Sequence, residues 1–125
     1  MILTSTKGWG ICDGLLVIPH VFFVGTSPAA TDAFPWFRTF LPLWLHYIEA
    51  QTDTGTVTGN YERRTVPETA GTDIFTSDQT FTTTFTKFSP NVRGVGPGGI
   101  LHYSASAVAS SPTRVSVYLF AESRP

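Results

Sequence analysis

Threonine and phenylalanine alternate along residues 74–88, whose sequence is IFTSDQTFTTTFTKF. Successive side chains of a strand point to opposite faces, so Phe75, Phe81 and Phe85 are predicted to share one face. The threonines predicted on the other face are Thr80, Thr82, Thr84 and Thr86. At about 3.3 Å per residue the run would span roughly 50 Å, well beyond the usual strand of about 5–6 residues. The pattern therefore predicts one long strand with an apolar face that packs and a hydroxyl-rich face that contacts a partner.

Two segments before this run also carry strand patterns. Residues 15–24 form a continuous apolar run that contains Pro19, as expected for a buried strand that the proline breaks. Residues 43–58 predict a second strand, which continues with alternating threonines. Its two faces are predicted to carry Trp44, His46, Ile48 and Ala50 on one side and Leu45, Tyr47, Glu49 and Gln51 on the other.

A helix over residues 36–50 is the competing interpretation of this region. Its apolar positions also fit a period of about 3.6 residues. Pro42 and the β-branched residues that follow favour the strand instead. The positions that fit the helical period are Leu41, Trp44, Leu45 and Ile48.

The last part of the chain predicts two strands, at residues 100–109 and 114–122, joined by a turn at 110–112. With residues 74–88 they are predicted to form a consecutive antiparallel set. Residues 89–99, rich in glycine and proline, predict a long connection of the kind that joins sheets. The side chains predicted to share a face are Leu101, Tyr103, Ala105 and Ala107 in one strand and Val115, Val117, Leu119 and Ala121 in the other.

These elements predict an all-β fold, an antiparallel β-sandwich or jelly roll in a single domain of residues 15–125. Residues 1–14, with glycines around Trp9, predict an extended amino-terminal arm. Residues 34–42 are expected to be irregular or edge structure, and residues 61–73 a long charged loop.

Composition narrows the possible partners. The chain has 125 residues, of which 42% are hydrophobic, enough for a single core. Charged residues make up only 14%, against about 25% in a typical domain, and the formal net charge is −1. Nucleic acid is not expected as a partner, because its phosphates require a basic patch. A net charge near zero favours association, which predicts a protein that works in an assembly.

Cysteine content and hydropathy add two expectations. Cys12 is the only cysteine, so no intrachain disulfide is possible and a buried thiol is expected. The start MILTSTKGWG lacks the pattern of a secretory signal, and no apolar run reaches the roughly 20 residues that a membrane span needs. Synthesis in the cytoplasm without a membrane segment is therefore expected.

Residue types suited to catalysis are present without a recognisable motif. The histidines His20, His46 and His102 fall on predicted strands, but their spacing does not predict a metal site. Ser104 lies two positions from His102 without the strained turn of a nucleophile motif. The glycine-rich residues 94–99 lack the lysine of a phosphate-binding loop. The sequence thus predicts no enzyme, no cofactor and no metal.

Aromatic residues concentrated between positions 34 and 44 are the best functional candidate. Large rigid aromatics with an arginine among them are enriched at protein interfaces. One wall of the core and a platform that stacks on sugars are the other two interpretations. The predicted contact surface comprises Trp9, Phe34, Trp36, Phe37, Arg38, Phe40 and Trp44, together with Thr80, Thr82, Thr84 and Thr86.

Residues 74–122 combine threonine and phenylalanine strands, a glycine- and proline-rich crossover and the terminal strand sequence RVSVYLFAE. In this style they resemble the small jelly-roll and β-sandwich proteins of virions, especially bacteriophage head and tail components. The resemblance implies a capsid, decoration (cement) or tail and fibre protein, which assembles with itself and with other virion proteins. The alternative is a carbohydrate- or receptor-binding β-sandwich module that uses Trp36 and Trp44 as stacking rings.

Overall fold

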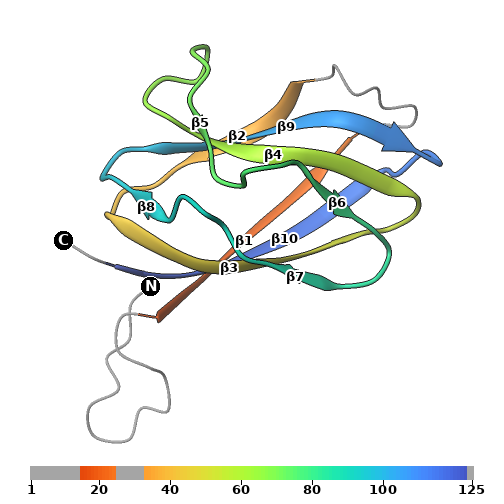
Figure 1. The fold of residues 1–125 in the computed structure, drawn as a ribbon, viewed down its shortest axis with the longest axis horizontal. Helices are drawn as coiled ribbons and strands as arrows, with labels where there is room; N and C mark the ends of the chain where they lie inside the picture. Colours follow the sequence, from red (N-terminus) through yellow and green to blue (C-terminus); the bar gives the residue numbers. More distant parts are fainter. Residues whose placement is uncertain (1–14, 25–32, 124–125) are drawn as a thin grey trace, which may run out of the picture.

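The computed structural model describes residues 15–24 and 33–123 (Figure 1). Every regular element in these ranges is a strand, and no helix in them is long and apolar enough to cross a membrane. The predicted arm with Trp9 and Cys12 lies outside the described residues. The strands are β1 (Leu15–Phe23), β2 (Ala33–Arg38), β3 (Leu43–Thr52), β4 (Thr56–Arg64), β5 (Thr72–Asp73), β6 (Gln79–Phe81), β7 (Thr86–Phe88), β8 (Gly94–Val95), β9 (Ile100–Ala109) and β10 (Arg114–Ser123).

The strands form two antiparallel sheets that face each other as a sandwich (Figure 1). The first sheet has the order β1-β10-β3-β7, with β8 also beside β3, and the second has the order β2-β9-β4-β5, with β6 also beside β4. Counting β5 with β6 and β7 with β8 as single interrupted strands gives the strand order of a jelly roll. The predicted all-β, single-domain sandwich is confirmed.

Side chains that alternate along the central strands fill the space between the sheets. The predicted apolar face of β10 is confirmed, because Val115, Val117, Leu119 and Ala121 are all fully buried. Full burial of one such valine or leucine side chain contributes about 1.5–3 kcal/mol. In the second sheet Tyr61 and Tyr103 pack against each other, with ring centroids 5.2 Å apart.

A β-bulge in β3 changes the predicted faces of that strand. Phe120 of β10 lies opposite Tyr47, but the next residue, Ala121, lies opposite Leu45, so His46 is the extra residue. The alternation shifts by one position there, and both Leu45 and Ile48 are buried. The prediction that Trp44 shares a face with Ile48 is therefore wrong.

The long strand predicted at residues 74–88 is also wrong. Only β6 and β7 are strands, and the chain between them crosses from the second sheet to the first. Threonine side chains explain the break, because the Thr82 hydroxyl accepts from the Thr84 N–H (3.2 Å) and the Thr86 hydroxyl donates to the Thr84 carbonyl (2.8 Å). Phe81 is buried while Phe85 is exposed, so the predicted apolar and hydroxyl-rich faces do not form.

Sheet assignment corrects several other predictions. Strands β9 and β10 lie in different sheets, so the last strands are not a consecutive set. Residues 61–73 include the end of β4 and all of β5, and residues 43–58 form a hairpin rather than one strand. The helix alternative is wrong as well. Residues 89–99 do join the two sheets, and β2 is an edge strand, as predicted.

Candidate functional site

One edge strand of each sheet, β1 and β2, lies next to the other on the same side of the sandwich. Among the described strands, β1 pairs only with β10 and β2 pairs only with β9. The two edges lie close together, since the rings of His20 in β1 and Phe37 in β2 are 4.8 Å apart. Residues 15–24 were predicted to be buried, yet Val17, Pro19 and Val21 of this edge strand face solvent. Open edges of this kind are templates for association with another chain.

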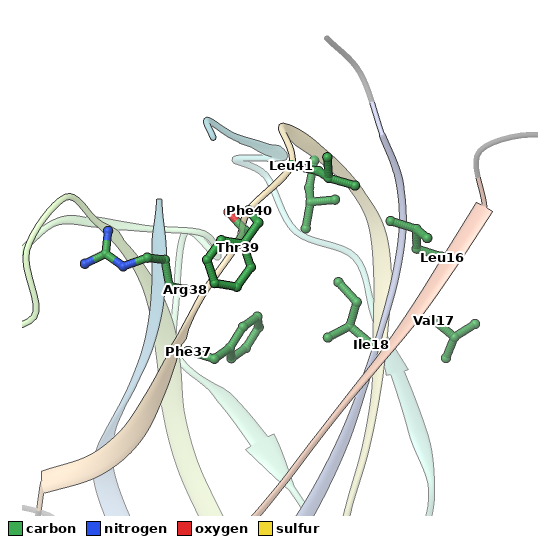
Figure 2. A pocket seen from close by; sticks show the side chains of 9 residues that line it. Leu16, Val17, Ile18, Phe37, Arg38, Thr39, Phe40 and Leu41 are labelled. Carbon is green, nitrogen blue, oxygen red and sulfur yellow. The ribbon is translucent and has the colours of Figure 1, made fainter. Parts of the chain in front are cut away.

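A cleft of about 230 Å³ opens between these edges at one end of the sandwich (Figure 2). Leu16 and Ile18 of β1 face Phe37 and Phe40 across it, whereas Arg38 and Val17 point away (Figure 2). We call this cleft and the exposed apolar residues around it the edge surface. The complete set is Leu16, Val17, Ile18, Trp36, Phe37, Arg38, Thr39, Phe40, Leu41 and Leu43.

Thr39 holds the exposed part of the edge surface in place. Its N–H donates to the Gly99 carbonyl (2.8 Å), and its carbonyl accepts from the Gly98 N–H (2.7 Å). The Thr39 side chain is buried, but the adjacent Phe40 is 85% exposed and Leu41 is 45% exposed. Because the backbone beside them is hydrogen-bonded, these two apolar side chains are presented to solvent from a fixed position.

The structure places the residues of the predicted aromatic contact surface in different regions of the sandwich. Phe37 and Phe40 line the cleft, and Arg38 lies beside it with its guanidinium on the Gly98 carbonyl (2.6 Å). Trp36 lies on the outer face of the second sheet and Trp44 on the outer face of the first, because their neighbours Phe37, which packs against the core, and Leu45, which is buried, point inward. The side chain of Phe34 and all of Trp9 lie outside the described residues.

The predicted threonines are spread over separate positions. Thr80 is in β6, where its hydroxyl oxygen lies 2.8 Å from that of Thr58. Thr82 and Thr84 lie in the connection between β6 and β7, and Thr86 begins β7 in the other sheet. Of the four predicted threonines, Thr80 is thus the one whose hydroxyl pairs with a threonine of a neighbouring strand in the described structure.

Sequence reasoning missed an aromatic group on the outer face of the first sheet. Tyr47 and Phe120 stack with ring centroids 4.5 Å apart, and the Lys87 ammonium lies 4.1 Å from the Tyr47 centroid. Phe85 meets Tyr118 edge-to-face at 5.8 Å. The alternation in β10 places Tyr118 and Phe120 opposite the predicted buried face, so the sequence did contain this signal.

The best catalytic candidates come together only partly. Ser104 Oγ lies 3.4 Å from His102 Nδ1 and 3.5 Å from Glu62 Oε2. A hydrolytic triad needs the histidine between the serine and the acid, whereas here the serine lies between the other two. The Arg64 guanidinium and the Gly71 N–H bind the Glu62 carboxylate and lower its pKa. These contacts form a surface hydrogen-bond network that lacks the order of a hydrolytic triad.

The three histidines face different environments. His20 points into the sandwich, His46 lies 3.7 Å from Glu122 on the outer face of the first sheet, and His102 lies on the outer face of the second. In the described ranges no three His, Cys, Asp or Glu side chains lie close enough to hold a metal ion. No family model, curated protein or solved structure matches the chain.

Proposed function

We propose that this chain is a non-enzymatic structural protein of a virion, which acts by self-association and by docking on a protein lattice. A capsid, decoration or minor head or tail subunit is the class intended. The observation that carries the proposal is the edge surface, where the open edges of both sheets flank a cleft rimmed by Phe40 and Leu41. The jelly-roll strand order supports it, because this architecture is frequent among viral capsid domains.

Burial of the edge surface would stabilise a contact between subunits. Phe40 is almost fully exposed, and its burial would contribute up to about 1.5–3 kcal/mol before ordering costs are deducted. Leu41 and Trp36 are already more than half buried, so each would contribute less. Thr39 limits those ordering costs because it already fixes the backbone next to Phe40. The small net charge of −1 adds little repulsion between copies.

Light scattering at micromolar concentration tests the proposal. The wild-type chain is expected to be an oligomer, and Phe40→Ser is expected to weaken its association by roughly 10- to 100-fold, matching the loss of about 1.5–3 kcal/mol. Phe85→Ser is the control, since Phe85 is also an exposed phenylalanine but does not belong to the edge surface. A monomeric wild-type chain that binds no lattice partner would contradict the proposal.

The carbohydrate-binding alternative receives less support from the geometry. Trp36 and Trp44 lie on the outer faces of different sheets, so one sugar cannot stack on both rings. Glycan-array binding that disappears in Trp36→Ala while folding is retained would favour this alternative over the structural role.

A further inference from the structure

A second cavity of about 560 Å³ lies between the end of β4, the loop that leads into β5 and the turn between β8 and β9. Arg63 and Arg64 form part of its wall, and the backbone of residues 96–99 forms the opposite part. We call this cavity the arginine pocket. It shares no lining residue with the cleft of the edge surface.

The positive charge of Arg63 is not balanced by a carboxylate in the part of the chain that the structure describes. Its guanidinium donates a hydrogen bond to the Gly94 carbonyl (2.7 Å) and forms no ion pair with another described residue. Arg38 is similar within residues 15–24 and 33–123, because its guanidinium donates to the carbonyl of Gly98, which lines the arginine pocket, and forms no ion pair there. A guanidinium has five N–H donors, so Arg63 keeps donors for a further ligand.

Arg64 differs from these two arginines. It forms an ion pair with Glu62 at 3.0 Å and also donates to the Pro67 carbonyl. Glu68 and Asp73 are the exposed carboxylates nearby along the chain, and neither forms an ion pair with Arg63 among the described residues. The wall of the pocket therefore contains Arg64, whose charge is balanced by Glu62, and the half-buried Arg63, whose charge no described carboxylate balances.

We propose that the arginine pocket binds an oxyanion group, a carboxylate or a phosphate, carried by a small molecule, with Arg63 as the principal contact. A guanidinium matches the geometry of both groups by donating two parallel N–H bonds. A volume of about 560 Å³ exceeds that of a bare ion and falls in the range of about 300–1,000 Å³ of small-molecule sites. This inference is independent of the proposed structural role.

Titration monitored by the backbone amide signals of Gly96, Gly98 and Gly99 tests the site. Inorganic phosphate and glucuronate are the probes, glucose is the neutral control, and sodium chloride keeps the ionic strength constant. We expect saturable shifts with at least one of the two anions and none with glucose. Shifts with phosphate alone identify a phosphate ligand, and shifts with glucuronate alone identify a carboxylate ligand.

Three variants separate the site from general charge effects. Arg63→Gln is expected to weaken anion binding at least fivefold. Gly96→Val is expected to weaken it by narrowing the pocket, since a Cβ at Gly96 meets no atom within 4 Å and the fold tolerates it. Arg114→Gln removes the same charge at an exposed position outside the pocket and should change the affinity less than twofold.

Two results would overturn the inference. One is a wild-type chain whose glycine signals do not saturate with either anion. The other is an equal loss of affinity in Arg63→Gln and Arg114→Gln, which would mean nonspecific attraction. Because the arginine pocket and the cleft of the edge surface share no lining residue, failure of anion binding would leave the proposed self-association intact, and a monomeric chain would leave the anion site intact.

Discussion

The Nδ1 atom of His20 lies 2.9 Å from the hydroxyl oxygen of Tyr61, so a hydrogen bond joins the two sheets inside the sandwich. His20 belongs to β1 of the first sheet and Tyr61 to β4 of the second. The rings of Phe22 and Phe37 lie 5.0 Å and 4.8 Å from the imidazole. Burial among these groups lowers the pKa of His20 to about 4.

This pKa predicts a loss of stability in mild acid. The unfolded chain binds the proton near pH 6.5 but the folded chain only near pH 4, so this contribution is complete above pH 6.5 and decreases as the pH falls towards 4. Because the imidazole is partly exposed, we expect a loss of about 1–2 kcal/mol, less than the full shift would give. Urea unfolding at pH 7.5, 6 and 4.5 measures this loss as a decrease in the free energy of unfolding. His20→Gln should make that free energy decrease less steeply as the pH falls. Equal slopes in both proteins would contradict the assignment.

Asp53 predicts a second acid-dependent change, at lower pH. Its carboxylate accepts from the Thr113 hydroxyl and from the N–H groups of Thr113 (3.0 Å), Arg114 (3.0 Å) and Thr54 (2.9 Å). These bonds, led by the Thr113 hydroxyl, hold the pKa of Asp53 well below its usual range. The stabilisation is therefore present above about pH 3.8 and is lost as the pH falls further.

Asp53→Ala should lower the melting temperature at pH 7, because the hairpin between β3 and β4 loses its attachment to the residues before β10. The difference from wild type should shrink at pH 2.5. Glu68→Ala, at an exposed loop position, is the control and should change neither value. A difference that stays constant with pH would assign the effect to packing instead.

Gly59 is expected to resist substitution. An alanine Cβ there would lie 2.2 Å from the Ser104 carbonyl oxygen and 2.8 Å from Ala105 Cα, both of the neighbouring strand. Gly59→Ala should destabilise the fold by about 1–3 kcal/mol, because the backbone must shift. Gly96→Ala, where the added methyl has open space, should stay within about 0.5 kcal/mol. Guanidinium unfolding of the two variants provides the comparison, and equal values would refute the predicted clash.

Asn60 serves as a backbone partner for the segment after β5. Its side-chain amide donates to the Phe75 carbonyl (2.9 Å), and its carbonyl oxygen accepts from the Phe75 N–H (3.1 Å). Asn60→Ala should cost about 2–4 kcal/mol, because two buried backbone groups lose their partner. The Phe75 side chain also packs in this region, so Asn60→Ala could lower stability by disturbing that packing as well as by removing the hydrogen bonds. Hydrogen exchange at the Phe75 amide reports on the hydrogen bond and so distinguishes the two causes. Unchanged protection of that amide would show that another group replaces Asn60.

Period-two alternation predicted the buried face of β10 along the strand, but that of β9 only from Leu101 to Ala105. A bulge at Ser106 shifts the alternation there and leaves Ala107 exposed, so the prediction that Ala107 shares the face of Leu101 is wrong.

Period-two alternation failed at residues 74–88, where threonine hydroxyls bind their own backbone and Asn60 replaces a strand partner. It also failed in β3, because a bulge shifts the alternation at His46 without any local sequence signal. Which strands share a sheet depends on contacts distant in sequence, so a local pattern does not determine it.

The candidate surfaces show the same limit. Phe37 and Phe40 could be selected from the sequence as interface residues, but the other wall of their cleft comes from Leu16 and Ile18 in β1. Arg63 is also distant in sequence from the glycines that complete the arginine pocket. In both cases the sequence indicated the residues on one wall of the site. The residues on the other wall are distant in sequence, and the order of the strands in the fold places them there.

The position of β10 constrains the order of folding. It lies between β1 and β3, and Leu15 pairs with Glu122. During synthesis on the ribosome β1 emerges early, but the strand that it must join is made more than ninety residues later. Loop closure over such distances makes folding slow. Until β10 emerges, the apolar residues of β1 remain without their native cover, so a nascent chain would benefit from chaperone protection.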